Sequence, residues 1–268
     1  GAAGAGARTP NGYGGSPALA GLGRHFELTV SCRGEPDPLG GYLVDIKDVD
    51  RAVHARAVPL LARACGERAG DDPLWLGPAL LGALRGSLRA PVTGVWLQLS
   101  PTYAVGAEEA PEAGVAEQQR KEAGMATALL RQSFDLAAAH RLHVASWSAE
   151  ENRRAFGKCN NPAGHGHNYR VEPVVAVKVG AEGARFSLAD LERLTEEHIV
   201  ARFDHKHLNQ DTREFGPGPG GVNPSVENIA RVFFEALAGP VRAAGADATL
   251  RSVTVWETDR TCATYAGE

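Results

Sequence analysis

The sequence has few cysteines, no long apolar run and no strong excess of one charge. The four cysteines are Cys32, Cys65, Cys159 and Cys262. They are scattered and include no CxxC pair, which argues against a disulfide framework and is typical of a reducing cytosol. No apolar run is long enough to span a bilayer, and no signal-peptide pattern is visible. The formal charge of −4 gives no reason to expect nucleic acid or an anionic membrane as a partner. We therefore expect a cytoplasmic protein.

The length of 268 residues and a hydrophobic content of 43% allow one large domain or two small ones. Residues 1–22 are rich in Gly and Ala and are expected to be a flexible leader. A first periodic block follows at 23–105, then a connector rich in Glu, Ala and Gln at 106–124, and a second block at 125–268. Seven of the nine histidines lie between residues 140 and 207, so imidazole chemistry belongs to the second block.

The two blocks share an order of elements in which strand, helices and closing strand follow one another. In the first block these elements are expected at 25–32, from residue 45, at 73–84 and at 95–99. In the second block they are expected in the segment leading to His140, from 165 to 179, from Ser187, from Ser225 and at 252–258. We interpret this order as a diverged internal duplication. Pro173 in the long strand predicts an edge position or a bulge.

A histidine-rich pattern in the second block indicates a metal site. The segment 157–169 reads GKCNNPAGHGHNY. Residues two apart in a strand point to the same face, so His165 and His167 can offer imidazoles to one ion. A third imidazole from the preceding apolar segment would complete a three-histidine set, and His140 and His143 compete for this place. Such a set leaves a coordination position open, and zinc is its default metal.

Three further groups have both a chemical and a structural interpretation. Cys159 lies in a polar loop beside the histidine strand, where cationic neighbours can lower the pKa of a thiol, although a lone cysteine is often inert core. Asp204 can hold one nitrogen of His205 and leave the other for proton transfer, although a histidine at a helix end is often only a favourable charge. Glu257 lies in an apolar strand, where a buried carboxylate needs partners, although it could also face solvent.

Five motifs of the second block occur in the order found in the 6-pyruvoyl-tetrahydropterin synthase family, which the block resembles. They are AAHRLH, GKCNNPAGHGHNY, FDHKHLN, PSVENIA and VWETD. The resemblance implies an α+β fold, the T-fold, in which an antiparallel four-stranded sheet carries two helices on one face and several copies associate into a β-barrel. The first block resembles this fold more weakly, through GEPDPLGG and LVDIKD, and lacks the HGH and Asp-His motifs. We therefore expect tandem T-fold domains, degenerate at 23–105 and catalytic at 125–268.

The resemblance also implies an activity, the conversion of 7,8-dihydroneopterin triphosphate to 6-pyruvoyl-tetrahydropterin with triphosphate elimination, a lyase step of tetrahydrobiopterin biosynthesis. It favours His140 over His143 as the third ligand. The implied residues are His140, His165 and His167 for zinc, Cys159, Asp204 and His205 for catalysis, and Glu257, Ser225 and Glu227 for substrate binding, with Glu257 holding the pterin. Mg²⁺ could accompany the triphosphate, and a homo-oligomer is expected.

Two alternatives remain open at this point. One is a 6-carboxytetrahydropterin synthase, which starts deazaguanine and queuosine biosynthesis from the same substrate. Five residues, 160–164, separate Cys159 from His165, and this spacing resembles the pyruvoyl type. The other alternative is a non-catalytic pterin-binding assembly protein, which the degenerate first block suggests.

Overall fold

The computed structural model describes residues 25–68, 70–109, 126–180 and 183–267. The predicted leader at 1–22 and residues 110–124 of the predicted connector lie outside these ranges. The strands are β1 (Glu27–Cys32), β2 (Val92–Gln98), β3 (Tyr103–Glu108), β4 (Ala126–Gln132), β5 (Phe134–His140), β6 (His165–Val179), β7 (Lys206–His207), β8 (Ala248–Thr258) and β9 (Thr261–Tyr265).

The helices are α1 (Ile46–Ala52), α2 (Val58–Glu67), α3 (Leu76–Leu84), α5 (Ala149–Phe156), α6 (Leu188–Thr195), α7 (Ala201–Phe203), α8 (Leu208–Asp211) and α9 (Val226–Ala244). A π-helical turn joins α1 to α2, and another joins α6 to α7. Short 3-10 turns precede α3 and follow α5. Among the described helices, none has the length and apolar character needed to cross a bilayer.

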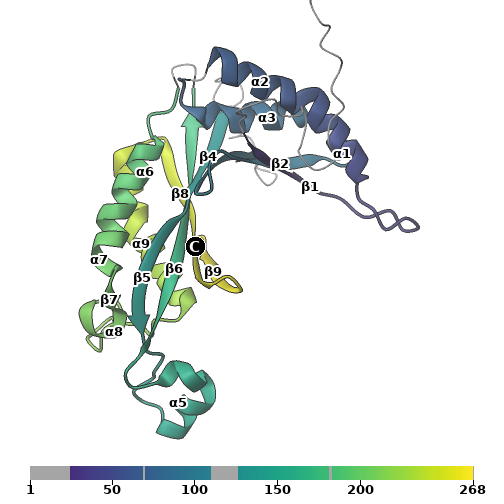
Figure 1. The fold of residues 1–268 in the computed structure, drawn as a ribbon. Helices are drawn as coiled ribbons and strands as arrows, with labels where there is room; N and C mark the ends of the chain where they lie inside the picture. Colours follow the sequence, from purple (N-terminus) through teal and green to yellow (C-terminus); the bar gives the residue numbers. More distant parts are fainter. Residues whose placement is uncertain (1–24, 69, 110–125, 181–182, 268) are drawn as a thin grey trace, which may run out of the picture.

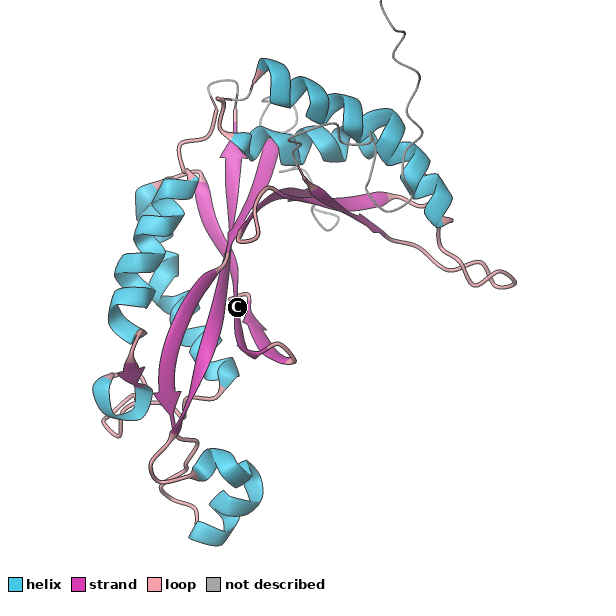
Figure 2. Cartoon of the chain, viewed as in Figure 1, coloured by secondary structure: helices cyan, strands magenta, loops and turns pink. Residues whose placement is uncertain are grey.

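One continuous sheet contains all the described strands. β1, β2 and β3 pair antiparallel in that order, and β3 pairs with β4. The long strand β6 is central, because β4 and β5 pair with successive parts of one edge and β8 pairs with the other. β9 extends the sheet beyond β8, and β7 runs parallel to β5. Figure 1 shows the sheet as an arch with the larger helices along its outer side, and Figure 2 shows the same layers by type of element.

The α+β prediction is confirmed, but the arrangement of the sheet differs from the expected tandem domains. A β-barrel was expected from the association of several copies and stays a prediction; within the described part of this chain the sheet is open, and β1 and β9 each pair with one neighbour only. The two blocks also share this sheet instead of forming one each. Residues 106–108, expected in the connector, lie in β3, and four residue pairs join β3 to β4. The described first block supplies three strands to the sheet, where four were expected.

Both halves nevertheless run through a strand, two helical segments and a hairpin in the same order. In the first half these are β1, α1–α2, α3 and the hairpin β2–β3, and in the second half they are β6, α6–α7, α9 and the hairpin β8–β9. The hairpin partner β9 was not expected from the sequence. A common origin of the halves stays a prediction.

The irregularity expected at Pro173 is present although the strand is central. β5 pairs with β6 up to Val171 and β4 begins at Val174, so Pro173 has no strand partner on that side. The pairing of β6 with β8 shifts register between Val174 and Val175. The proline therefore sits where the ladder is interrupted, because it has no N–H to donate there.

Helices α6 and α9 cover the face of the sheet that carries the histidines. α6 begins at the predicted capping box of Ser187 and Asp190. α9 begins after Ser225, whose side chain accepts from the backbone N–H of Asn228. The fully buried side chains on these helices include Leu191, Ile229, Phe233 and Leu237. Burying each such side chain contributes about 1.5–3 kcal/mol, so the helix start near residue 225 is held firmly against the sheet.

Helix α5, which the sequence did not predict, lies in the connection from β5 to β6. Ser148 and Glu151 form a capping box at its start. Asn152 is fully buried, accepts the N–H of Val144 and donates to the carbonyl of Val144. These bonds fix the long loop that carries Cys159 back to the start of β6.

Candidate active site

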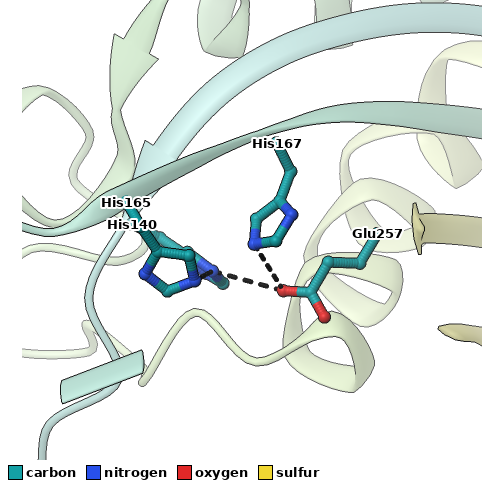
Figure 3. Close-up of side chains that lie close together, drawn as sticks. All are labelled: His140, His165, His167 and Glu257. Carbon is teal, nitrogen blue, oxygen red and sulfur yellow. Dashed lines mark hydrogen bonds and ion pairs between the residues drawn. The ribbon is translucent and has the colours of Figure 1, made fainter. Parts of the chain in front are cut away.

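The three predicted imidazoles meet at one end of the central strand. His140 ends β5 and lies opposite His165, which begins β6, while His167 lies opposite Ala138. The ring centroid of His140 is 4.5 Å from that of His165 and 5.2 Å from that of His167. Figure 3 shows the three rings converging on a common point. The alternation of side chains in a strand therefore works here as the sequence predicted.

The tautomer of His140 follows from its hydrogen bond. Its side chain is 1% exposed, and Nδ1 lies 2.8 Å from the carbonyl oxygen of Pro224. A carbonyl can only accept, so Nδ1 carries the proton and Nε2 is left with a lone pair. Nε2 lies 3.1 Å from Nε2 of His165, so its lone pair can accept a proton from that ring or face the same bound cation.

Glu257, at the end of β8, completes this cluster. Its Oε1 lies 3.2 Å from Nε2 of His140 and 3.3 Å from Nε2 of His167. The four potential ligand atoms of His140, His165, His167 and Glu257 all lie within 4.8 Å of one another. The sequence assigned Glu257 to the pterin ring, and the structure places it against the histidines.

The electrostatics of the cluster suit a cation. Burial, followed by the neighbouring rings, lowers the pKa of His165. Burial also lowers the pKa of His167, against the opposing effect of the Glu257 carboxylate. The pKa of Glu257 is lowered first by its contact with His140 and then, against the effect of burial, by the other rings. A hydrogen bond from Nε2 of His140 to Glu257 would require a second proton on that ring. The cluster therefore needs an added proton or a bound cation.

The distances fit a small tetrahedral ion. A tetrahedral zinc with ligands at about 2.0–2.1 Å places those ligands about 3.3–3.4 Å apart. Three of the six ligand-to-ligand distances, 3.1, 3.2 and 3.3 Å, are close to this edge, and all six are within 4.8 Å. Three imidazoles and one carboxylate are also ligands that zinc accepts. These residues could hold such an ion if the more distant ligands moved closer together.

Asp204 and His205 form the predicted pair at the open edge of β5. Oδ2 of Asp204 lies 2.7 Å from Nδ1 of His205, and Oδ1 accepts the N–H of Ala137 at 2.8 Å. His205 donates its own N–H to the carbonyl of Ala137. These bonds hold His205 at a φ of +55°, the only positive φ of a non-glycine residue in the described ranges.

This geometry fixes which nitrogen of His205 is left without a partner in the pair. Asp204 accepts from Nδ1, so Nε2 is free to take a proton. Burial tends to raise the pKa of Asp204, but the hydrogen bonds from Ala137 and His205 outweigh it and lower the pKa. The His205 side chain is 82% exposed and lies outside the histidine cluster.

Cys159 is half-buried in the 3-10 turn after α5 and lies outside the four-residue cluster. Its carbonyl accepts the N–H of Leu142, the second residue after His140. Its charge also acts on Tyr169, because burial, then Glu257 and then Cys159 raise the pKa of that phenol. The thiol and the Glu257 carboxylate therefore both lie within electrostatic reach of one buried hydroxyl.

Tyr169 is the site residue that the sequence interpretation missed. Its side chain is 1% exposed, and its hydroxyl has no hydrogen-bond partner among the described residues. Its ring lies edge-on to His140, with centroids 6.0 Å apart, and close to His167 at 5.5 Å. The signal was available, because residue 169 follows 165 and 167 at the same spacing of two.

The remaining predicted residues lie around the start of α9. Ser225 and Glu227 lie one and three residues after Pro224, the partner of His140. Ser225 acts as the helix cap, and Glu227 is exposed in the first turn. His143, the competing ligand, contacts Asn160 through Nδ1 at 3.0 Å and stays outside the cluster.

Comparisons with known proteins agree with this arrangement. A family model described as 6-pyruvoyl tetrahydropterin synthase matches residues 129–268. The 6-pyruvoyl tetrahydrobiopterin synthase of Homo sapiens is 40% identical over 136 residues, which are 50% of this chain and 88% of that protein. A putative 6-carboxy-5,6,7,8-tetrahydropterin synthase of Archaeoglobus fulgidus is 34% identical over 93 residues, 35% of this chain and 70% of that protein.

A solved structure of Caenorhabditis elegans 6-pyruvoyl tetrahydropterin synthase has 32% identity and a TM-score of 0.47, and the match covers 54% of this chain and 96% of that one. The family match begins inside β4 and includes every residue of the histidine cluster, but none of β1, β2 or β3. The chain belongs to the 6-pyruvoyl tetrahydropterin synthase family.

Proposed function

We propose that this chain is a zinc-dependent lyase that converts 7,8-dihydroneopterin triphosphate to 6-pyruvoyl-tetrahydropterin and eliminates triphosphate, in tetrahydrobiopterin biosynthesis. The observation that carries the proposal is the cluster of His140, His165 and His167, whose ring nitrogens lie close together at one end of the central strand. Family membership supplies the reaction class, and the cluster supplies a place for the metal.

In this proposal His140, His165 and His167 hold zinc. When bound, zinc supplies a Lewis acid that makes the protons of the substrate's side chain easier to remove. The hydrogen bond from Nδ1 of His140 to Pro224 orients the ring and fixes its tautomer, the usual role of a second partner of a ligating histidine. Mg²⁺ would accompany the triphosphate as a counterion and would need no dedicated protein ligands.

Cys159 is the proposed base, since its backbone bonds to Leu142, two residues after His140, and its thiol does not belong to the cluster. His205, oriented by Asp204, carries the second proton at Nε2. Glu257 accepts two hydrogen bonds from the pterin edge, and Ser225 and Glu227 add contacts at the start of α9. A carboxylate suits adjacent ring N–H and amino donors because it can accept both at once.

The chain is further proposed to be a tandem T-fold protein that forms a homo-oligomer. The edge of β1 that faces away from β2 and the edge of β9 that faces away from β8 are unpaired within the described residues, and open sheet edges favour association. The 82% exposure of His205 also supports assembly, because a proton carrier works best when water is excluded from it.

Product analysis tests the proposal and its alternatives. The zinc-loaded chain should convert 7,8-dihydroneopterin triphosphate to a product with the mass of 6-pyruvoyl-tetrahydropterin, and the chelated protein should not. Release of acetaldehyde would instead indicate the carboxy product, which the five-residue spacing before His165 disfavours. Zinc binding without turnover would indicate a pterin-binding assembly protein.

A further inference from the structure

We infer that Glu257 has two positions: it closes the resting metal site as the fourth ligand, and it moves to the pterin when substrate binds. The inference rests on the proposed function, since it takes the cluster to hold zinc. It differs from that proposal in giving Glu257 a role at the metal before any pterin is present.

The first argument is the position of one oxygen. Oε1 of Glu257 lies 3.2 Å from Nε2 of His140 and 3.3 Å from Nε2 of His167. Both values match the edge of a zinc tetrahedron, about 3.3–3.4 Å. This oxygen therefore lies where a fourth ligand would lie. Figure 3 shows Oε1 directed at the rings and the second oxygen directed away from them.

The second argument is that a site closed by four protein ligands has no place for a substrate. Structural zinc sites are closed in this way, whereas catalytic sites keep a position open. One of the four residues must therefore leave, or the site must expand. His140 is fully buried and held by Pro224. His165 and His167 are fixed by the pairing of β6 with β5.

Glu257 is the residue that we expect to move. Its exposure of 18% is close to the 20% of His167, so its position on the strand decides. It lies beyond the last residue pair of β8 with β6, where the pairing with β9 also shifts register between Trp256 and Thr258. Its second oxygen points away from the histidines. A rotation of this flexible side chain would release Oε1 without disturbing the sheet.

The third argument explains why the pterin would cause the movement. To accept both donors of the pterin edge, the carboxylate needs both oxygens. Oε1 cannot coordinate the metal and at the same time accept a full hydrogen bond from the pterin. Binding of the ring therefore opens the metal position that the side chain of the same substrate then occupies. Without a pterin the metal stays shielded from water and from other small ligands.

The movement of Glu257 would couple the affinity for zinc to the affinity for the pterin ring. If ring binding removes a metal ligand, a pterin without side-chain oxygens must weaken zinc binding, and zinc must weaken the binding of that pterin by the same factor. If Glu257 is only a pterin anchor, the two affinities are independent.

The experiment compares zinc affinity in three full-length proteins by competition with a chromophoric chelator: the wild type, Glu257→Gln and Glu172→Gln. Glu172 is a matched control, because it is 20% exposed and lies on β6, but it contacts Arg170 and Ser133 on the opposite face. We expect Glu257→Gln to weaken zinc binding by about tenfold to a hundredfold, which is the effect of losing a residue that hydrogen-bonds to a metal ligand. We expect Glu172→Gln to weaken zinc binding by less than about twofold.

A second measurement needs no variant and holds even if Glu257→Gln fails to fold. The cobalt(II)-loaded wild type is titrated with 7,8-dihydropterin, which has no side chain, and its visible spectrum is recorded. We expect the ligand-field bands to change, because coordination geometry sets their position and intensity. An unchanged spectrum in the presence of bound dihydropterin would overturn the inference, as would wild-type zinc affinity in folded Glu257→Gln. Either result leaves the proposed function standing if the wild type is active, whereas absence of turnover in the zinc-loaded wild type would defeat the proposed function itself.

Discussion

Replacement of Asp204 by asparagine would change the proton on His205 while leaving the shape of the site almost intact. In the wild type, Oδ2 accepts from Nδ1 of His205 and Oδ1 accepts from the N–H of Ala137. Asparagine keeps one oxygen, which can still accept from Ala137. Its amide group then faces Nδ1 and donates to it, so the imidazole proton moves to Nε2. The nitrogen that should take a proton becomes a donor.

The size of the two effects differs widely. A hydrogen bond to a charged group contributes about 1.5–3 kcal/mol and a neutral one about 0.5–1.5 kcal/mol, so the variant should lose about 1 kcal/mol of unfolding free energy. Loss of a positioned acid–base group typically lowers turnover by about a hundredfold to ten-thousandfold. We therefore expect a modest change in stability together with a severe loss of activity, with zinc content unchanged.

The pH dependence of stability gives a further check. The pKa of Asp204 is lowered in the folded protein, and its unfolded value is about 3.9. The carboxylate therefore stabilises the fold above about pH 4, and this contribution is lost as the pH falls through the lower folded pKa. Asp204→Asn lacks this carboxylate at every pH. The unfolding free energies of the variant and the wild type should therefore converge in acid.

Urea unfolding, zinc analysis and turnover of 7,8-dihydroneopterin triphosphate measure these effects. Asp190→Asn is the matched control, because Asp190 also has a lowered pKa and accepts from the backbone and hydroxyl of Ser187, remote from the cluster. It should lose similar stability and keep its activity. Full turnover in Asp204→Asn, or equal loss in both variants, would refute the assignment of the pair as a proton carrier.

Other perturbations have equally definite outcomes. Cys159→Ala should keep its zinc, measured by atomic absorption, and lose about a hundredfold to ten-thousandfold in turnover; zinc loss in proportion to activity would make Cys159 a ligand. Tyr169→Phe removes a buried hydroxyl without a partner and should raise the unfolding free energy in urea by about 1 kcal/mol, whereas a decrease would reveal a hydrogen bond. Deletion of residues 1–120 exposes the edge of β4 and should lower subunit number or solubility in light scattering. Unchanged assembly with full activity would exclude a scaffolding role for the first block.

The sequence predicts those parts of the site that depend on local periodicity. The spacing of His165 and His167 needs only a strand, and the pattern at Ser187 needs only a helix start. Both are decided by residues within a few positions of each other, so they can be read without knowledge of the fold.

The sequence predicted Glu257 as a site residue but not its contact with the histidines, because such contacts depend on pairing between distant strands. Glu257 reaches the histidines because β8 pairs with β6, with Trp256 opposite Arg170, and no local pattern encodes that register. The single sheet likewise depends on β3 meeting β4 across the residues between them. Helix α5 was missed because its apolar pattern is weak and one turn of capping residues is its main signal.

The pairing of β3 with β4 also affects how the protein unfolds. A ladder of backbone hydrogen bonds runs from β1 through β4 to β6, the strand that presents His165 and His167. Strands joined in this way tend to unfold together, because loss of one strand exposes the unpaired edge of the next. A substitution at Leu97, which is fully buried in β2 and outside the histidine cluster, is therefore expected to lower the amount of folded protein in the cell by increasing its degradation. The first half of the chain, whose described residues contribute nothing to the histidine cluster, would thus help to set how many folded molecules a cell retains.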